Sequence, residues 1–389
     1  MHAPCWLTCL ETRMHLKFCS LISSQPFVFV LAMFISSLGL IADARPSIDL
    51  SGRWAFRLDP DDVGLAQNWS AGDGYPDELV LPGSLQAQGF GLEPSLETAW
   101  SSGIGSNLLY DERYALYTQG DRFVSPFFLT PDRHYVGAAW YARVVEIPRD
   151  WAGKSVRLTL ARPHWGTTVW IDGAEIGSRE GIGVPHRYEI EQGLAPGSHR
   201  LVIRVDNRMI RPIGRDAHAV SDQTQSNWNG IVGDLTLEAF DVGWSLGTPW
   251  ITPNLGERSV RIGSWVGGEE AFERGTLALE VVGDNGSVLT HTSVELGSDG
   301  RLVERLDDHG AFIVEWSLPE TVECWDEFNP AVYTLRARLL DGDGEERDTV
   351  STTFGLREII AGGTRFLVSG EPVLMRGALD CAIFPDAGY

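Results

Sequence analysis

A polar segment near the middle of the chain carries the side chains best suited to hold a ligand. Asp206, Asn207, Asp222 and Asn227 supply carboxylate and amide groups, and Trp228 adds a broad aromatic face. An array of hydroxyl groups suits this set because carboxylates accept hydrogen bonds, amides donate and accept them, and an aromatic face can lie beneath a ring. We therefore take these five residues as the candidate ligand-binding residues.

Each candidate also has a purely structural interpretation. Asp206 and Asn207 are residue types that fix a turn by bonding to nearby backbone groups. Trp228, like Trp140, is a large side chain of the kind that packs in a core. Both alternatives stay open, because the residue types suit either role.

No other motif in the sequence indicates a binding or catalytic site as clearly. The histidines are scattered without metal-ligand spacing, and the glycine-rich stretches 89–91 and 103–105 are not followed by a predicted helix that would bind phosphate. The aspartate-rich turn at 341–344 lacks the distal glutamate of a calcium loop. Three of the five cysteines precede residue 20, which leaves only Cys324 and Cys381 and no disulfide framework. We expect no metal and no cofactor.

The charge balance narrows the classes of partner. The chain has 53 acidic against 31 basic residues, a formal net charge of −22. Nucleic acids and anionic membrane surfaces attract clustered Lys and Arg, so this balance disfavours both as partners. The sequence does not indicate an oligomeric state.

Residues 1–44 have the pattern of a signal peptide. Basic residues precede an apolar run at 27–42, and Ala42-Asp43-Ala44 forms a small-x-small cleavage pattern. The run is shorter than the roughly 20 residues that cross a bilayer, which favours removal over retention as a membrane helix. Met14 is an alternative start that gives a more ordinary signal length. We therefore expect a secreted or periplasmic protein with no membrane association after cleavage.

The elements that position the polar segment are short strands. Apolar residues alternate in 156–160 and 201–205, which predicts strands with one buried face. The runs 168–171 and 174–176 flank Asp172-Gly173, a pair that favours a type I′ hairpin turn. Later alternating runs, spaced by turns, are typical of a small immunoglobulin-like sandwich. The predicted fold is all-β.

Several separated groups of residues together resemble glycoside hydrolase family 2, the group of β-galactosidase, β-glucuronidase and β-mannosidase. The motifs that carry the resemblance are Leu50-Ser51-Gly52-Arg53-Trp54, Leu81-Pro82-Gly83-Ser84, Ala139-Trp140-Tyr141, Val169-Trp170-Ile171-Asp172-Gly173, Val205-Asp206-Asn207, Asn229-Gly230-Ile231, Asn329-Pro330 and Phe354-Gly355-Leu356-Arg357. Their order along the chain matches as well as their content.

The resemblance implies a division of the chain into domains. Residues 45–240 are similar to the family's jelly-roll (galactose-binding-like) sugar-binding β-sandwich, and 241–360 to its immunoglobulin-like β-sandwich. Residues 361–389 resemble the entry hairpin and first strand region of the family's (β/α)8 barrel. In the family, an acidic residue in the motif matched by Asp206 approaches the sugar.

The resemblance also implies that the catalytic residues lie elsewhere. Family members use two glutamates on barrel strand ends, the acid/base one preceded by asparagine, and no Asn-Glu dipeptide occurs in this sequence. A complete barrel takes about 250 residues. We therefore assign no catalytic residue, and expect a non-catalytic N-terminal part of a secreted hydrolase, truncated in the gene or its model, that recognises a carbohydrate but is inactive alone.

Two alternatives from other functional classes remain open. One is a free-standing secreted carbohydrate-binding module without hydrolase activity. The other is a pair of structural sandwiches that dock on another chain. The sequence does not name the sugar.

Overall fold

The computed structural model describes residues 45–100, 111–118, 132–190, 192–211, 213–214, 217, 227–267, 271, 274–296, 303–305 and 311–378. These residues are built mainly of strands, which confirms the predicted all-β fold. The proposed signal peptide, Asp222 and Cys381 lie outside them. Among the residues in these ranges, no helix has the length and apolar character to cross a membrane.

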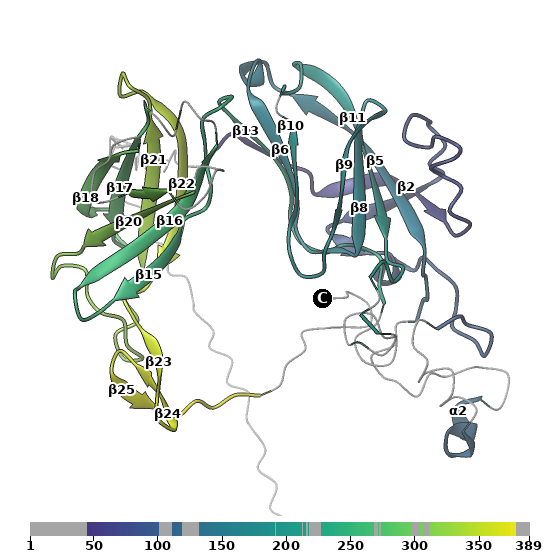
Figure 1. Cartoon of the computed structure of the whole chain (residues 1–389). Helices are drawn as coiled ribbons and strands as arrows, with labels where there is room; N and C mark the ends of the chain where they lie inside the picture. The colour runs from purple at the N-terminus through teal and green to yellow at the C-terminus, as the bar shows by residue number, and fades with distance from the viewer. Residues whose placement is uncertain are drawn as a thin grey trace, which may run out of the picture. The chain divides into compact units, whose positions relative to one another are not determined.

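The first sandwich consists of two main sheets and a small one (Figure 1). The larger sheet has the order β3 (Asp77–Leu81), β2 (Gly52–Asp59), β5 (Ala138–Ile147), β11 (Gly197–Asp206), β8 (Gly166–Ile171), β9 (Ala174–Glu180). The second has the order β1 (Ser47–Asp49), β13 (Leu235–Phe240), β6 (Ser155–Leu160), β10 (His186–Ile190). The small one has the order β4 (Gly83–Ser84), β12 (Gly230–Ile231), β7 (Pro163–His164).

The core of this sandwich lies between the two main sheets. Alternate residues of each strand point inward, so Phe56, Tyr141 and Ile203 of one sheet and Leu158 and Leu237 of the other are buried in one cluster. Burying a side chain of this size stabilises the fold by about 1.5–3 kcal/mol. The predicted alternation at 156–160 and 201–205 therefore corresponds to β6 and β11.

The predicted hairpin is confirmed between β8 and β9. Ile171 pairs with Ala174, which leaves Asp172 and Gly173 as a two-residue turn. Their φ angles are 51° and 81°, in the left-handed region that a type I′ turn requires.

The six-stranded sheet is also covered on its outer face, by the segment that follows β2. Trp69 of this segment packs with Trp140 of β5 and Trp170 of β8 in a second, smaller apolar cluster. The rings of Trp140 and Trp170 stack with centroids 5.1 Å apart, and the Arg57 guanidinium lies 3.4 Å from the centroid of the Trp69 ring. Even-numbered residues of β11 project to this outer face.

The second sandwich has its own core and two sheets (Figure 1). One has the order β14 (Ser245–Leu246), β16 (Ser259–Gly267), β20 (Ala311–Ser317), β19 (Val303–Arg305), and β15 (Trp250–Asn254) also pairs with β16. The other has the order β18 (Val288–Glu295), β17 (Thr276–Val282), β21 (Tyr333–Leu340), β22 (Glu346–Phe354). A last sheet comprises β23 (Ile359–Gly362), β24 (Arg365–Val368), β25 (Glu371–Val373). The short helices are η1 (Gln86–Gln88), η2 (Glu112–Tyr114), α2 (Ala115–Thr118) and η3 (Arg149–Trp151).

Candidate functional site

Asp206, the first candidate residue, is the last residue of β11. It pairs with Ala138 of β5 on one side and with Gly166 of β8 on the other. The strand is central in the six-stranded sheet, so the position of its end is fixed by two ladders of hydrogen bonds. Because alternate side chains share a face, Asp206 and Arg204 both project to the outer face.

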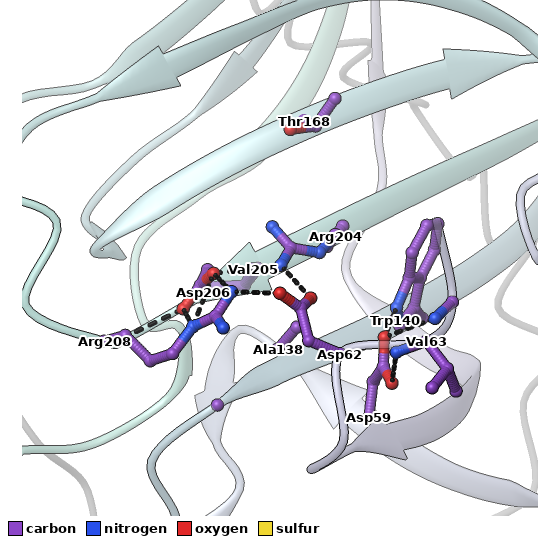
Figure 2. Close-up of polar contacts among 12 residues, drawn as sticks. Asp59, Asp62, Val63, Ala138, Trp140, Thr168, Arg204, Val205, Asp206 and Arg208 are labelled. Atoms are coloured by element: carbon purple, nitrogen blue, oxygen red, sulfur yellow. Dashed lines mark hydrogen bonds and ion pairs between the residues drawn. The ribbon is translucent and has the colours of Figure 1, made fainter. Parts of the chain in front are cut away.

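Asp206 belongs to a cluster of two aspartates and two arginines (Figure 2). Its Oδ2 accepts a hydrogen bond from Nη2 of Arg204 at 2.9 Å, and its Oδ1 accepts one from Nε of Arg208 at 2.9 Å. Asp62 completes the cluster, with Oδ1 2.7 Å from Nη2 of Arg204 and Oδ2 2.8 Å from Nη2 of Arg208. We call these four residues the Asp206 cluster. Its formal charges cancel.

The four side chains of the Asp206 cluster differ in how deeply they are buried. The side chains of Asp206 and Arg204 are only 8% and 10% exposed, whereas those of Asp62 and Arg208 are 34% and 43% exposed. Charge-assisted hydrogen bonds compensate the desolvation of the inner pair. The outer pair is the part of the cluster that a ligand can reach.

The arginines control the ionisation of the carboxyls. Burial alone would raise the pKa of Asp206, but hydrogen bonds from Arg208 and the charges of Arg204 and Arg208 outweigh it and hold that pKa below its ordinary value. The pKa of Asp62 is lowered in the same way, against the opposing effect of burial. Both carboxyls are therefore ionised at neutral pH and act as acceptors.

A turn after β2, held by the buried side chain of Asp59, positions Asp62. The Asp59 carboxylate accepts hydrogen bonds from the backbone N–H groups of Val63 and Gly64, at 2.8 and 2.9 Å, and from Nε1 of Trp140 at 2.9 Å. Figure 2 shows Asp59, a third aspartate, beside the Asp206 cluster. Asp62 itself has φ of 54°, a left-handed conformation that aspartate tolerates better than most residues. The turn brings a carboxylate from the first strand region to the end of β11.

Asn207, the second candidate, is fully buried and holds the chain entering β5. Its Oδ1 accepts a hydrogen bond from the Gly137 N–H at 2.8 Å, and its Nδ2 donates to the Tyr135 carbonyl at 2.7 Å. Both polar atoms of the amide are thus occupied by backbone groups. A role in binding stays a prediction for this residue, and in this structure its amide fixes a turn.

The structure adds Asn229, which the sequence presents only as part of a motif. Its Oδ1 accepts a hydrogen bond from the Tyr141 hydroxyl at 2.9 Å, and its Nδ2 donates to the carbonyls of Gly137 and Val205 at 3.1 and 3.2 Å. The side chain is fully buried. Asn229 therefore joins the residue before β5 to the end of β11.

Asn227 and Trp228 lie beside a different part of the sandwich, and Asp222 lies outside the described residues. The Trp228 ring is buried and packs on the His164 ring with centroids 4.7 Å apart, while the Trp228 carbonyl contacts Nδ1 of His164 at 2.7 Å. Asn227 is also buried, and within the part of the chain that the structure describes its Oδ1 has no hydrogen-bond partner. Buried polar atoms normally have a hydrogen-bond partner, so this oxygen is able to accept a further hydrogen bond.

The site offers fixed hydrogen-bonding groups rather than a metal centre. Among the described residues no group of three or more His, Cys, Asp or Glu side chains is arranged to hold a metal ion. The outer edge of the Asp206 cluster presents a guanidinium and a carboxylate whose partners already orient them. Such a pair recognises hydroxyl groups, which both donate and accept.

The fold thus defines an all-β protein of two consecutive sandwiches, with a polar cluster at the end of a central strand of the first. Comparison of the sequence with family models matches the sugar-binding domain of glycosyl hydrolases family 2 at residues 48–240 and a second family 2 domain at 268–357. These two matches cover most of the chain. The chain belongs to glycosyl hydrolase family 2, as its sequence motifs predict.

Characterised relatives are glycosidases. A β-glucuronidase of Paenibacillus borealis is 23% identical over 345 residues, which are 85% of this chain and 48% of the relative. A β-galactosidase of Arthrobacter sp. (strain B7) is 26% identical, over 85% of this chain and 29% of the relative. The chain therefore spans about half or less of the length of these relatives.

Solved structures show the same fold. The crystal structure of Ruminococcus gnavus β-glucuronidase superposes with a TM-score of 0.59 at 19% identity, over 86% of this chain and 49% of that one. At this identity the likeness establishes the fold alone.

Proposed function

We propose that this chain contributes substrate recognition to a secreted glycosyl hydrolase of family 2 that cleaves the O-glycosyl bond of a β-glycoside. The observation that carries the proposal is the match of the sugar-binding domain to residues 48–240, the same region that holds the Asp206 cluster. The relatives support it, since they are β-glucuronidases and β-galactosidases.

Within this proposal the buried pair of the Asp206 cluster orients the more exposed pair. Asp206 and Arg204 fix Arg208 and Asp62, whose more exposed side chains meet the sugar hydroxyls. Preorganised donors and acceptors lose little conformational entropy on binding. Asp222, Asn227 and Trp228 remain the further candidates on the same connection.

We assign no catalytic carboxylate in this chain. Retaining glycosidases hold an acid/base and a nucleophile about 5 Å apart, and the carboxylates of the Asp206 cluster are each bound to arginine. An ion-paired carboxyl with a lowered pKa is a poor general acid at neutral pH. The proposed role is therefore recognition, not bond cleavage.

Calorimetric titration of the full chain with methyl β-galactoside, methyl β-mannoside and methyl β-glucuronide tests the proposal. We expect binding of at least one sugar, weakened by about tenfold in Asp206→Asn, which leaves Arg208 and Asp62 less firmly oriented, and in Asp222→Ala, which loses a charged hydrogen bond. Glu78→Gln, in an exposed ion pair on β3, is the matched control and should bind as the parent does. The absence of heat with all three sugars would contradict the proposal.

Export is the second part of the proposal. It is supported by the apolar run and the Ala42-Asp43-Ala44 pattern. N-terminal sequencing of the protein recovered outside the cytoplasm should find a start close to Arg45, and a retained Met1 or Met14 would contradict cleavage at this site.

A further inference from the structure

Two tryptophans lie exposed on one sheet of the second sandwich. Trp250 of β15 and Trp265 of β16 are 39% and 51% exposed, and their ring centroids are 5.4 Å apart with the planes inclined by 60°. The two strands are neighbours in the ladder (Figure 1). Adjacent exposed indoles form an apolar patch, and such patches commonly mark binding surfaces.

Glycines shape this pair of rings. A Cβ atom at Gly263 would lie 1.9 Å from Cζ2 of Trp250, and one at Gly247 would lie 2.9 Å from Cε3 of Trp265. The Trp250 ring therefore lies over Gly263 and the Trp265 ring over Gly247, in space that a larger side chain at either glycine would occupy. The arrangement spreads the indoles over the sheet.

Polar side chains lie on the same face, one step along the ladder. Trp250 pairs with Gly263, and Thr252 pairs with Arg261, which in turn pairs with Glu315 of β20. Cross-strand partners share a face, so the aromatic pair and this polar row are contiguous. Nε of Arg261 and Oε1 of Glu315 are 4.0 Å apart, and both side chains are exposed.

We propose that Trp250 and Trp265 form a second carbohydrate-binding surface, which takes a neutral oligosaccharide of hexopyranose units. The C–H groups of a pyranose ring pack on the electron-rich face of an indole, while Arg261, Glu315 and Thr252 bond its hydroxyls. The net charge of −22 opposes polyuronates and other polyanions. The ligand class follows from family membership, and the surface does not depend on the Asp206 cluster.

Two other interpretations make different predictions. Aromatic rings that cover glycines can serve the sheet alone, in which case their removal lowers stability without affecting any ligand. An apolar patch can also pair with a protein, including a second copy of this chain, in which case its removal changes the assembly state.

Tryptophan fluorescence and calorimetric titration of the full chain with cellohexaose, mannohexaose and β-1,4-galactohexaose test the proposal, with hexagalacturonate as the charged comparator. We expect at least one neutral hexasaccharide to bind more tightly than the charged one. Trp250→Ala and Trp265→Ala should each weaken that binding by about tenfold or more, the scale of ring stacking on an aromatic side chain. Trp265→Phe should retain part of the affinity.

The control is Phe328→Ala, which removes an aromatic side chain that is 90% exposed on the same domain and should leave affinity unchanged. Trp250→Ala and Trp265→Ala should leave the titration with the methyl β-glycosides unchanged, which separates the outcome from that of the first sandwich. Thermal melts verify that each variant is folded. Binding of no neutral hexasaccharide, or unchanged affinity in both folded tryptophan variants, would overturn the proposal. A changed sedimentation coefficient without glycan binding would assign the surface to a protein partner instead.

Discussion

Replacing Asp206 by Asn probes the centre of the candidate site with little change in shape. The substitution removes one negative charge between Arg204 and Arg208 but keeps an oxygen that accepts a hydrogen bond. Arg204 retains Asp62 at 2.7 Å, while Arg208 retains Asp62 at 2.8 Å. The cluster changes from neutral to a net positive charge, and its most buried arginine loses half of its ionic partners.

The expected loss lies between two limits. Breaking a fully buried ion pair costs about 3–5 kcal/mol, whereas an exposed pair contributes about 0–1 kcal/mol. Asp206 and Arg204 are at the buried end of this range, but Arg208 and Asp62 are partly exposed, and Asn keeps part of the hydrogen bonding. We therefore expect a loss of about 2 kcal/mol in the free energy of unfolding at pH 7, or roughly 4–8 °C in melting temperature.

The difference in free energy of unfolding between the parent and Asp206→Asn should depend on pH. The folded-state pKa of Asp206 is lowered, so its contribution is present above the unfolded pKa of about 3.9 and is lost as the pH falls through the folded value. The gap between parent and Asp206→Asn should therefore narrow below about pH 4.

Urea unfolding of the full chain at pH 7 and at pH 3, followed by tryptophan fluorescence, measures both effects. Asp62→Asn is the matched control, because its carboxylate is more exposed and its removal should cost less. An Asp206→Asn variant as stable as the parent, a larger loss in Asp62→Asn, or a gap that does not vary with pH would each refute this account of the cluster.

Two further predictions concern the supports of the sheet. Asn229→Ala should lower the free energy of unfolding by about 2–4 kcal/mol, since it leaves the fully buried Tyr141 hydroxyl without its acceptor. A double-mutant cycle with Tyr141→Phe should show a coupling energy of about 1 kcal/mol or more. Additive losses in urea unfolding would contradict this contact. Burial alone would lower the pKa of His199, but its bonds to the Ala195 carbonyl and to Asp172 raise it, so its stabilising effect is full below the unfolded pKa and is lost as the pH rises through the folded value. His199→Gln should remove that decline in stability at near-neutral to mildly alkaline pH, and an unchanged profile would count against it.

Local sequence patterns were sufficient to predict several strands, one hairpin turn and the family. The alternation in β6 and β11 predicts strands because a sheet buries one face, and Asp172-Gly173 predicts its turn because few residues adopt positive φ at two successive positions. These inferences need only the chain's own periodicity.

The partners across the fold required the tertiary structure. Asp62 lies 142 residues from Arg204, and Asn229 lies 88 residues from Tyr141, so no local pattern joins them. The same limit explains why the sequence could not choose between binding and packing for the candidates. Asn207 and Asn229 have the chemistry of ligand-binding amides, but the strands around them present backbone groups that occupy their atoms.

The sequence by itself thus determined the all-β fold, the family and the segment in which to look for a site, because residue type and spacing encode them. Only the tertiary structure decided which polar groups remain accessible, since accessibility depends on the chain segments that fold over each side chain. Asp206 is held inward by Arg204, whereas Arg208 and Asp62 stand at the edge. Exposure of this kind is a property of the packed sheets, not of any single strand.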